Sequence, residues 1–361
     1  MVKLFGREYT RRELQGFTGN MAQLGGIRPL ELVAGRERGV RGFDVATGTG
    51  FEFTVLADRA LDPTRASYKG RSLVYLSPAG QPHPAYYEPA GLGWLRTFPA
   101  GLITTCGLRH VGSPSEEEGE AFGLHGRIST LPAEELGYWG AWEGDDYWMH
   151  ITGTVTEGVI FGNPLRLTRH LTAKLGGNSL RIEDTVENIG GSPTPHMMLY
   201  HCNFGFPLLS PSSELIANSK RVTPRDDVAA QGLMAYNTFE PPTPGYAEQV
   251  FYHEMTADNA GDVRVALVNP DLDNGLGIYV QYHQKHLPRF IQWKMMGYGS
   301  YVLGLEPANC FVEGRAKERE RGNLLLLQPG EKLDYHIEIG VLDGREEIER
   351  CAAEIKLGAG L

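Results

Sequence analysis

Short runs of β-branched and aromatic residues, each closed by Gly, Asn, Asp or Pro, follow one another through almost the whole chain. Residues 167–187 and 263–282 each hold two alternating runs around a glycine-containing turn, the pattern of a β-hairpin. The 46 glycines and 22 prolines are spread along the chain, as turns between many strands require. No strand alternates regularly with a long helix, which disfavours Rossmann and TIM-barrel architectures. The sequence therefore predicts an all-β fold.

Helical patterning is confined to two short segments near the ends of the chain, residues 10–21 and 345–356. No linker divides the 361 residues, so we expect a single domain over residues 1–361. Its extensions are expected at about residues 1–39 and 344–361. The charged stretch 314–323 (GRAKERERGN) is expected to be a solvated loop.

Charge and cysteine content restrict the classes of partner. The formal net charge of −10 argues against nucleic acid or an anionic membrane as the main partner, but not against a neutral small molecule. The four cysteines lack C-x-x-C spacing, and no window approaches a membrane span, so we expect a cytoplasmic protein with reduced thiols. The oligomeric state stays open; a homo-oligomer is possible, since the segment 5–21 can pack on a neighbouring copy or on its own sandwich.

Two titratable side chains stand alone in apolar runs. His201 lies within an aromatic strand of the segment 186–209 (VENIGGSPTPHMMLYHCNFGFPLL), and Glu306 lies at the end of another apolar run, YVLGLEPANC. Burying either group is costly without a partner or a function, and the apolar neighbours of Glu306 favour a raised pKa. Such a pair is typical of a general acid and a general base. The alternatives are a core histidine bonded to a backbone carbonyl and a glutamate in a buried ion pair.

The alternation of the strand around His201 separates its neighbours into two faces. Asn203 shares the face of His201, whereas His196 and Cys202 take the opposite face. A paired histidine ligand set and a Cys/His nucleophilic dyad are therefore both disfavoured. Pro307, which follows Glu306, is expected to end that strand.

Three further residues are candidates for binding. His125 lies between Gly123 and Gly126, and small neighbours allow a ligand or backbone to approach closely; a solvent-facing turn histidine is the alternative. Arg96 is expected on a strand face between two aromatic residues, as in sugar sites or in a snorkelling arginine. Lys294 is a charge within the aromatic segment FIQWKMMGYG, open to ligand contact or to a solvent-facing position.

Two loops rich in proline, glycine and aromatic residues, 77–95 and 239–248, suit either the rim of a ligand cleft or a plain cover over a sheet edge. Motifs for phosphate, dinucleotide or zinc binding and the G-x-S-x-G elbow are missing. The spacing of His283 and His286 is a weak metal signal without a third histidine nearby.

Four segments in order resemble motifs of the aldose 1-epimerase (galactose mutarotase) superfamily, in particular an aldose-epimerase-like branch of uncharacterised function. They are GLHGRI, the segment 186–209, GLEPAN and LLLLQPGEKLDYHIEIGV, and together they span about residues 40–343. The chain departs from the family pattern in having Tyr200 before the histidine, Cys202 after it, and Pro307 after the glutamate. These departures put the choice of substrate in doubt more than the type of reaction.

The resemblance implies an antiparallel β-sandwich (a supersandwich) with a few short helices and a site in a concave cleft. It implies mutarotation, the interconversion of the anomers of an aldose, without a metal or redox cofactor. Glu306 would take the proton of the anomeric hydroxyl and His201 would protonate the ring oxygen. His125, Arg96, Asn203 and Lys294 would contact the sugar.

Two other functions are consistent with the same residues. One is a non-catalytic carbohydrate-binding or regulatory protein with the same fold, motivated by the departures beside His201 and Glu306. The other is a metal-dependent enzyme with His125, His201 and Glu306 as ligands, although the close H-x-H spacing of such sites is missing. The sequence identifies neither the sugar, nor its ring size, nor whether it carries an anionic group.

Overall fold

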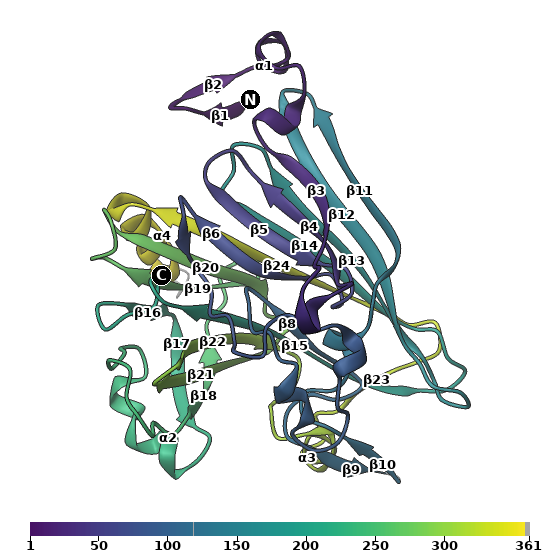
Figure 1. Cartoon of the computed structure of the whole chain (residues 1–361). Coiled ribbons are helices and arrows are strands. Elements are labelled where there is room, and N and C mark those ends of the chain that lie inside the picture. The colour runs from purple at the N-terminus through teal and green to yellow at the C-terminus, as the bar shows by residue number, and fades with distance from the viewer. Residues whose placement is uncertain (118, 358–361) are drawn as a thin grey trace.

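A computed structural model describes residues 1–117 and 119–357 and confirms an antiparallel β-sandwich with few helices (Figure 1). The largest sheet has eight strands, and every neighbouring pair in it is antiparallel. In spatial order the strands are β11 (Glu134–Glu143), β12 (Asp146–Glu157), β13 (Leu165–Lys174), β14 (Ser179–Asn188), β24 (Lys332–Asp343), β20 (Leu276–His283), β19 (Asp262–Asn269) and β16 (Glu214–Ala217). Both expected hairpins, β13–β14 and β19–β20, are confirmed.

A second sheet carries the candidate catalytic residues. Its strands in spatial order are β17 (Ser219–Pro224), β18 (Gln249–Met255), β21 (Arg289–Gly297), β22 (Ser300–Ala308), β15 (Thr194–Gly205) and β23 (Leu325–Leu327), with β8 (Thr104–Leu108) paired to β15. A third sheet is formed by β3 (Gly26–Glu31), β4 (Arg41–Ala46), β5 (Phe51–Leu56), β6 (Asp62–Tyr68) and β7 (Arg71–Ser72).

Two small hairpins lie at opposite ends of the molecule (Figure 1). They are β1 (Val2–Leu4) with β2 (Arg7–Tyr9), and β9 (Ser115–Glu117) with β10 (Glu120–Phe122). The α-helices are α1 (Arg11–Phe17), α2 (Asp227–Gln231), α3 (Arg315–Glu320) and α4 (Arg345–Leu357). Single 3-10 turns are formed by Met21–Gln23, Gly35–Glu37, Pro84–Tyr86, Gly93–Arg96, Ile128–Thr130 and Leu233–Ala235.

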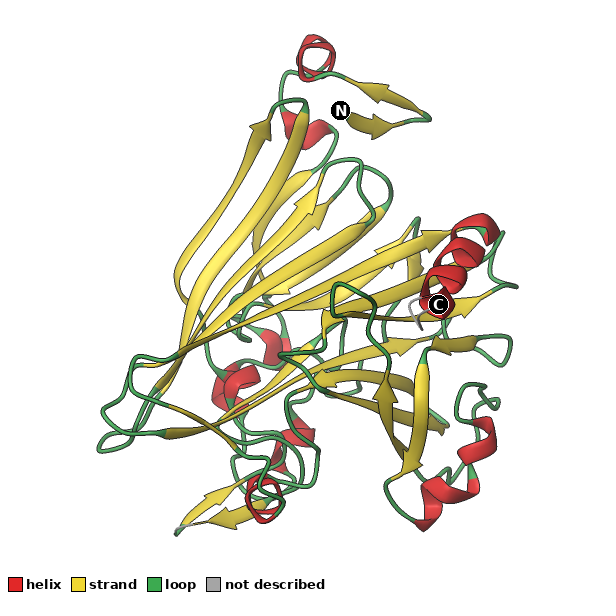
Figure 2. Cartoon of the chain, turned by 180° about the vertical axis from the view of Figure 1, so that it is seen from behind, coloured by secondary structure: helices red, strands yellow, loops and turns green. Residues whose placement is uncertain are grey.

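The two expected helices form, each for a local reason. Thr10 caps α1 and exchanges hydrogen bonds with Glu13 in a capping box, which satisfies two backbone donors that the first turn leaves free. In α4, Ile348, Cys351 and Ile355 recur at helical spacing and are buried against the eight-stranded sheet. Figure 2 shows α4 lying across one end of the long strands.

One face of the eight-stranded sheet is a continuous apolar surface on which both other sheets pack. The cross-strand partners on this face form one row: Tyr138, Ile151, Leu171, Ile182, Ile337 and Tyr282. At one end Tyr138 contacts Phe43 of the third sheet, with ring centroids 5.0 Å apart. At the other end Tyr282 stacks on Phe290 of the second sheet, with centroids 6.0 Å apart. Alternation along each strand therefore produces the sandwich core.

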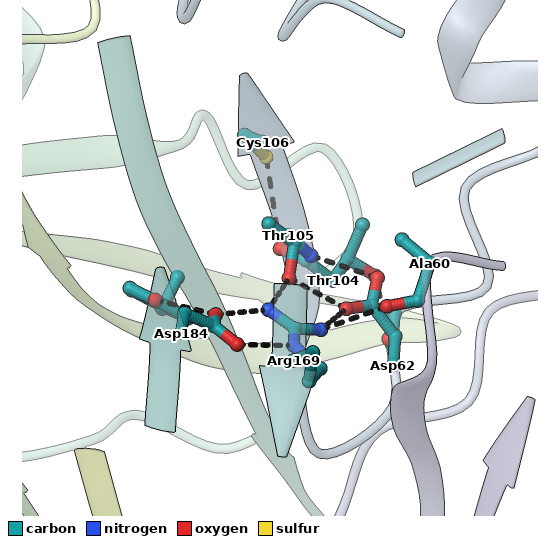
Figure 3. A network of polar contacts seen from close by, with 9 residues as sticks. Ala60, Asp62, Thr104, Thr105, Cys106, Arg169 and Asp184 are labelled. Carbon is teal, nitrogen blue, oxygen red and sulfur yellow. Dashed lines mark hydrogen bonds and ion pairs between the residues drawn. The ribbon is translucent and has the colours of Figure 1, made fainter. Parts of the chain in front are cut away.

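A buried charge network joins strands of these three sheets (Figure 3). Arg169 of β13 is fully buried and donates hydrogen bonds to both carboxylate oxygens of Asp184, to Asp62 and to the hydroxyl of Thr105. Tyr200 also donates to Asp184, at 2.7 Å. Because Thr105 of β8 pairs with Tyr200 of β15, the network fixes the strand that carries the neighbouring His201.

Two local expectations are wrong. The charged stretch after residue 313 contains α3, and Arg315 and Glu318 within it are buried. Arg315 forms an ion pair with Glu117 of the distant strand β9, a contact that spacing along the chain cannot reveal. Pro307 does not end its strand, because β22 continues to Ala308.

Candidate active site

The two lone titratable residues meet on one sheet face. The register of β15 with β22, in which Leu199 pairs with Ala308 and Cys202 with Leu305, sets His201 directly opposite Glu306. Nε2 of His201 lies 3.3 Å from Oε1 of Glu306. Residues that are 105 positions apart in the sequence are therefore side by side.

A glycine makes room for this pair. Gly304 lies two residues before Glu306 and so shares its face of β22. A β-carbon at Gly304 would lie 2.6 Å from Oε1 of Glu306 and 3.3 Å from Cε1 of His201. A glycine inside an apolar strand often marks a close approach of neighbouring atoms. Gly304 has this signal, but the sequence did not identify it as part of the site.

The pair opens into a cavity of about 300 Å³ above the second sheet. Trp94 and Phe98 form one stacked wall, with ring centroids 4.3 Å apart. The ring of Phe98 lies 5.3 Å from that of His201, and Trp293 approaches His201 from another side at 5.4 Å. The remaining lining residues are Leu92, Leu95, Gly112, Ser113, Pro114, Leu124, His125, Arg225, Glu248, Val250, Ile291, Glu306 and Val312.

Burial favours the uncharged forms of both groups. His201 is 5% exposed and Glu306 is 2% exposed. Loss of solvation lowers the pKa of His201 to about 4 and raises the pKa of Glu306 to about 8, the second shift being increased by the nearby Glu248. At neutral pH the contact is therefore a carboxylic acid beside a neutral imidazole, not an ion pair. The two groups together hold one transferable proton, that of the carboxylic acid.

His125 completes the polar end of the cavity. Its ring centroid lies 5.7 Å from that of His201, and its pKa is well below the usual value because of burial and the neighbouring imidazoles. Its backbone φ of 58° is in the left-handed region, which is strained for a non-glycine residue and is concentrated at functional sites. Nδ1 of His125 is buried without a hydrogen-bond partner in the protein, so this ring nitrogen has the capacity to bond a ligand.

Arg225, Glu248 and Trp293 form a hydrogen-bonded group in the cavity lining that the sequence did not predict. Glu248 accepts hydrogen bonds from Nη2 of Arg225 at 3.1 Å and from the indole N–H of Trp293 at 2.8 Å. Nε of Arg225 also donates to Asp226. The proline-rich loops expected near a ligand do contribute here, with Leu92, Trp94 and Leu95 from one loop and Glu248 from the end of the other.

The other three predicted contact residues lie outside the cavity lining. Arg96 is in a 3-10 turn, not on a strand, and its exposed guanidinium pairs with Glu88. Lys294 lies on the face of β21 opposite to Trp293, where it is fully buried and bonded to Glu240 and to the carbonyl of Ala235.

Asn203 shares the face of His201 but is covered by a neighbouring loop. It donates hydrogen bonds to the carbonyls of Gly101 and His201. These bonds hold the strand and the loop beside the pair of His201 and Glu306. The placement of these three residues therefore gives them structural contacts, and the expected sugar contacts have no support in this geometry.

A larger hollow lies elsewhere and lacks this chemistry. It measures about 640 Å³ and lies over the third sheet, lined by charged residues such as Arg28 and Asp44, which pair with each other at 3.1 Å. In residues 1–117 and 119–357, no three His, Cys, Asp or Glu side chains are placed to hold a metal ion. No helix within the same ranges has the length and apolar character needed to cross a membrane.

Comparison with solved structures places the fold among mutarotase-like sandwiches. A protein from Klebsiella pneumoniae, provisionally assigned as an aldose 1-epimerase, is similar with a TM-score of 0.89 and 25% identity, over 94% of this chain and 91% of that one. A galactose mutarotase-like protein from Clostridium acetobutylicum has a TM-score of 0.61 at 11% identity, covering 90% and 100% of the two chains. The galactose 1-epimerase of Lactobacillus acidophilus NCFM has a TM-score of 0.56 at 11% identity, covering 89% and 100%.

The superfamily expected from the sequence is thus confirmed at the level of the fold. No characterised protein matches this chain in sequence. Residues 37–341 match the model of a family described as a domain of unknown function, DUF4432, and the chain belongs to that family.

Proposed function

We propose that this protein is a mutarotase, an isomerase that interconverts the anomers of an aldose by ring opening and closure. The observation that carries the proposal is the buried contact of 3.3 Å between His201 and Glu306 at the end of a cavity of about 300 Å³. The fold shared with a protein provisionally assigned as an aldose 1-epimerase supports the same reaction class.

The single proton of the pair suits this reaction. Ring opening removes a proton from the anomeric hydroxyl and adds one to the ring oxygen, so one group must accept while the other donates. A carboxylic acid beside a neutral imidazole is already one donor and one acceptor. After opening, the pair again holds one proton, with donor and acceptor exchanged, and this is the state that ring closure requires.

The protonation states of Glu306 and His201 at neutral pH decide which group acts as the acid and which as the base. With pKa values of about 8 for Glu306 and about 4 for His201, the proton lies on the carboxyl group at neutral pH. Glu306 then protonates the ring oxygen and His201 accepts the hydroxyl proton in the opening step. The direction expected from the family, with Glu306 as base, requires the proton to move first across the contact to His201.

The aromatic walls supply binding rather than chemistry. The C–H faces of a sugar pack well on aromatic rings, and Trp94, Phe98 and Trp293 border the pair on two sides. His125, with an unpartnered ring nitrogen, is positioned to bond a sugar hydroxyl.

The test is polarimetry on freshly dissolved α-anomers. The wild-type protein should accelerate anomer equilibration of at least one aldose, and Glu306→Gln should remove the acceleration while the fold is retained. Glu254→Gln, an exposed glutamate of β18, is the matched control and should keep full activity. Sugar binding by calorimetry with no acceleration across a broad panel would instead favour the carbohydrate-binding function.

A further inference from the structure

The charges around the cavity bear on the substrate class, an inference that rests on the proposed function. Among the lining residues, all within the described ranges, Arg225 alone has a permanent positive charge. Its guanidinium bonds both Asp226 and Glu248, so two carboxylates face one cation. An anionic substituent entering the cavity would meet Glu248 without a free cation to pair with, which is unfavourable.

The surface beside the proton pair is apolar. Ile291 is the cross-strand partner of Glu306, and Val250 is the partner of Trp293 in the next row of the same sheet face. On the other side, the rings of Phe98 and Trp293 flank His201. The polar atoms of this surface are already engaged, since the indole N–H of Trp293 donates to Glu248.

In an aldose ring, the substituent that would meet this apolar surface is the exocyclic group on C5. The ring oxygen joins C1 to C5, so the exocyclic group on C5 lies next to the oxygen that the proton pair must reach. Whichever of His201 and Glu306 serves the ring oxygen, we expect the C5 substituent against the side chains that flank that group: Phe98 and Trp293 beside His201, or Ile291 beside Glu306. A hydroxymethyl group there would bring its hydroxyl among apolar side chains, whereas a methyl group would pack on them.

The rim of the cavity is also apolar. Leu92 and Leu95, on either side of the buried Trp94, are 60% and 51% exposed and both line the cavity. Two exposed leucines beside a stacked aromatic wall form an apolar entrance. Val312 and Leu124 extend the apolar lining from two further loops.

We propose that the cavity accepts an uncharged sugar that has a methyl group on C5, that is, a 6-deoxy sugar. Specificity arises because the titratable groups His125, His201 and Glu306 of the lining serve the reacting end of the ring. The apolar residues serve the C5 substituent.

The experiment compares sugars that differ only in one hydroxyl group. Mutarotation rates are measured by polarimetry for D-galactose with D-fucose, L-mannose with L-rhamnose, and D-glucose with 6-deoxy-D-glucose. In the pair with the preferred ring stereochemistry, the deoxy sugar should have a kcat/KM at least about tenfold higher, the range that one group in an apolar pocket provides. D-Glucose 6-phosphate and D-glucuronate should be no faster than D-glucose.

A variant links the preference to the apolar surface. Val250→Thr replaces a methyl group by a hydroxyl at nearly constant volume and should reduce the deoxy preference several-fold. Val228→Thr, on the partly exposed α2, is the control and should leave it unchanged. Equal or faster turnover of the hydroxymethyl sugar in every pair, or faster turnover of an anionic sugar, overturns this inference while the mutarotase function stands. No acceleration for any sugar overturns the function itself.

Discussion

Replacing Arg169 by methionine should destabilise the protein strongly, because the side chain makes five hydrogen bonds in the buried network of Figure 3. The change leaves Asp62 and Asp184 in the core without their cation. Removing one partner of a buried ion pair costs about 3–5 kcal/mol. For 361 residues the unfolding entropy is about 0.8 kcal/mol per degree, so the melting temperature should fall by about 4–7 °C.

Arg166→Met is the matched control, on the same strand three residues earlier. Arg166 also faces a carboxylate on β14, that of Glu187, but its side chain is 40% exposed. An exposed pair contributes about 0–1 kcal/mol, so this variant should melt within about 1 °C of the wild type. Differential scanning calorimetry at pH 7 measures both. Equal melting temperatures of the two variants would refute the argument that the network contributes more to stability because it is buried.

The pH dependence of the same variant has a definite sign. Burial raises the pKa of Asp62 even in the wild type, although Arg169 opposes this shift. Without the arginine the folded-state pKa rises further, so protonated Asp62 favours the fold. The penalty of Arg169→Met should therefore be smallest below the unfolded pKa of an aspartate and should grow as pH rises through the folded value. Calorimetry at pH 5 and pH 7.5 measures this difference.

Three further predictions concern the site. Gly304→Ala should reduce kcat at least about tenfold, because its new methyl group would displace Glu306, whereas Gly191→Ala, with open space at the β-carbon, should have no effect in the same polarimetric assay. The pH profile of kcat/KM should fall above about pH 8, as Glu306 loses its proton, and below about pH 4, as His201 gains one; a plateau through pH 10 would contradict the shared proton. Trp293→Phe keeps an aromatic side chain but replaces the indole by a smaller ring and loses its N–H bond, and should raise KM more than it lowers kcat in steady-state kinetics; a kcat loss alone would argue for a direct role in proton transfer.

The fold was largely accessible from the sequence because its determinants are local. The hairpin β13–β14 follows from alternation around a glycine turn, and α1 from the reciprocal Thr10 and Glu13 cap. Helix α3 was missed because its stability comes from a distant partner. Arg315 is buried only where strand β9 brings Glu117 to it.

The site was accessible in part for the same reason. His201 and Glu306 stand out because an ionisable group in an apolar run is costly wherever the strands meet. Lys294 shows the same signal. It follows Trp293 directly in β21 and therefore lies on the opposite strand face, which points away from the cavity. Arg225 and Glu248 lie in polar loop context, and only the folded chain brings them to the cavity. A charged residue in an apolar segment thus predicts burial, but only the register and face of its strand decide whether it reaches the cavity.

The central claim is that His201 and Glu306 act as one unit on one proton. A double-mutant cycle on the mutarotation rate, with His201→Asn, Glu306→Gln and the double variant, tests it most directly. If each group works only with the other, either single variant loses nearly all the acceleration and the double variant loses no more. Losses that multiply in the double variant would show two independent contributions and would contradict the shared-proton mechanism.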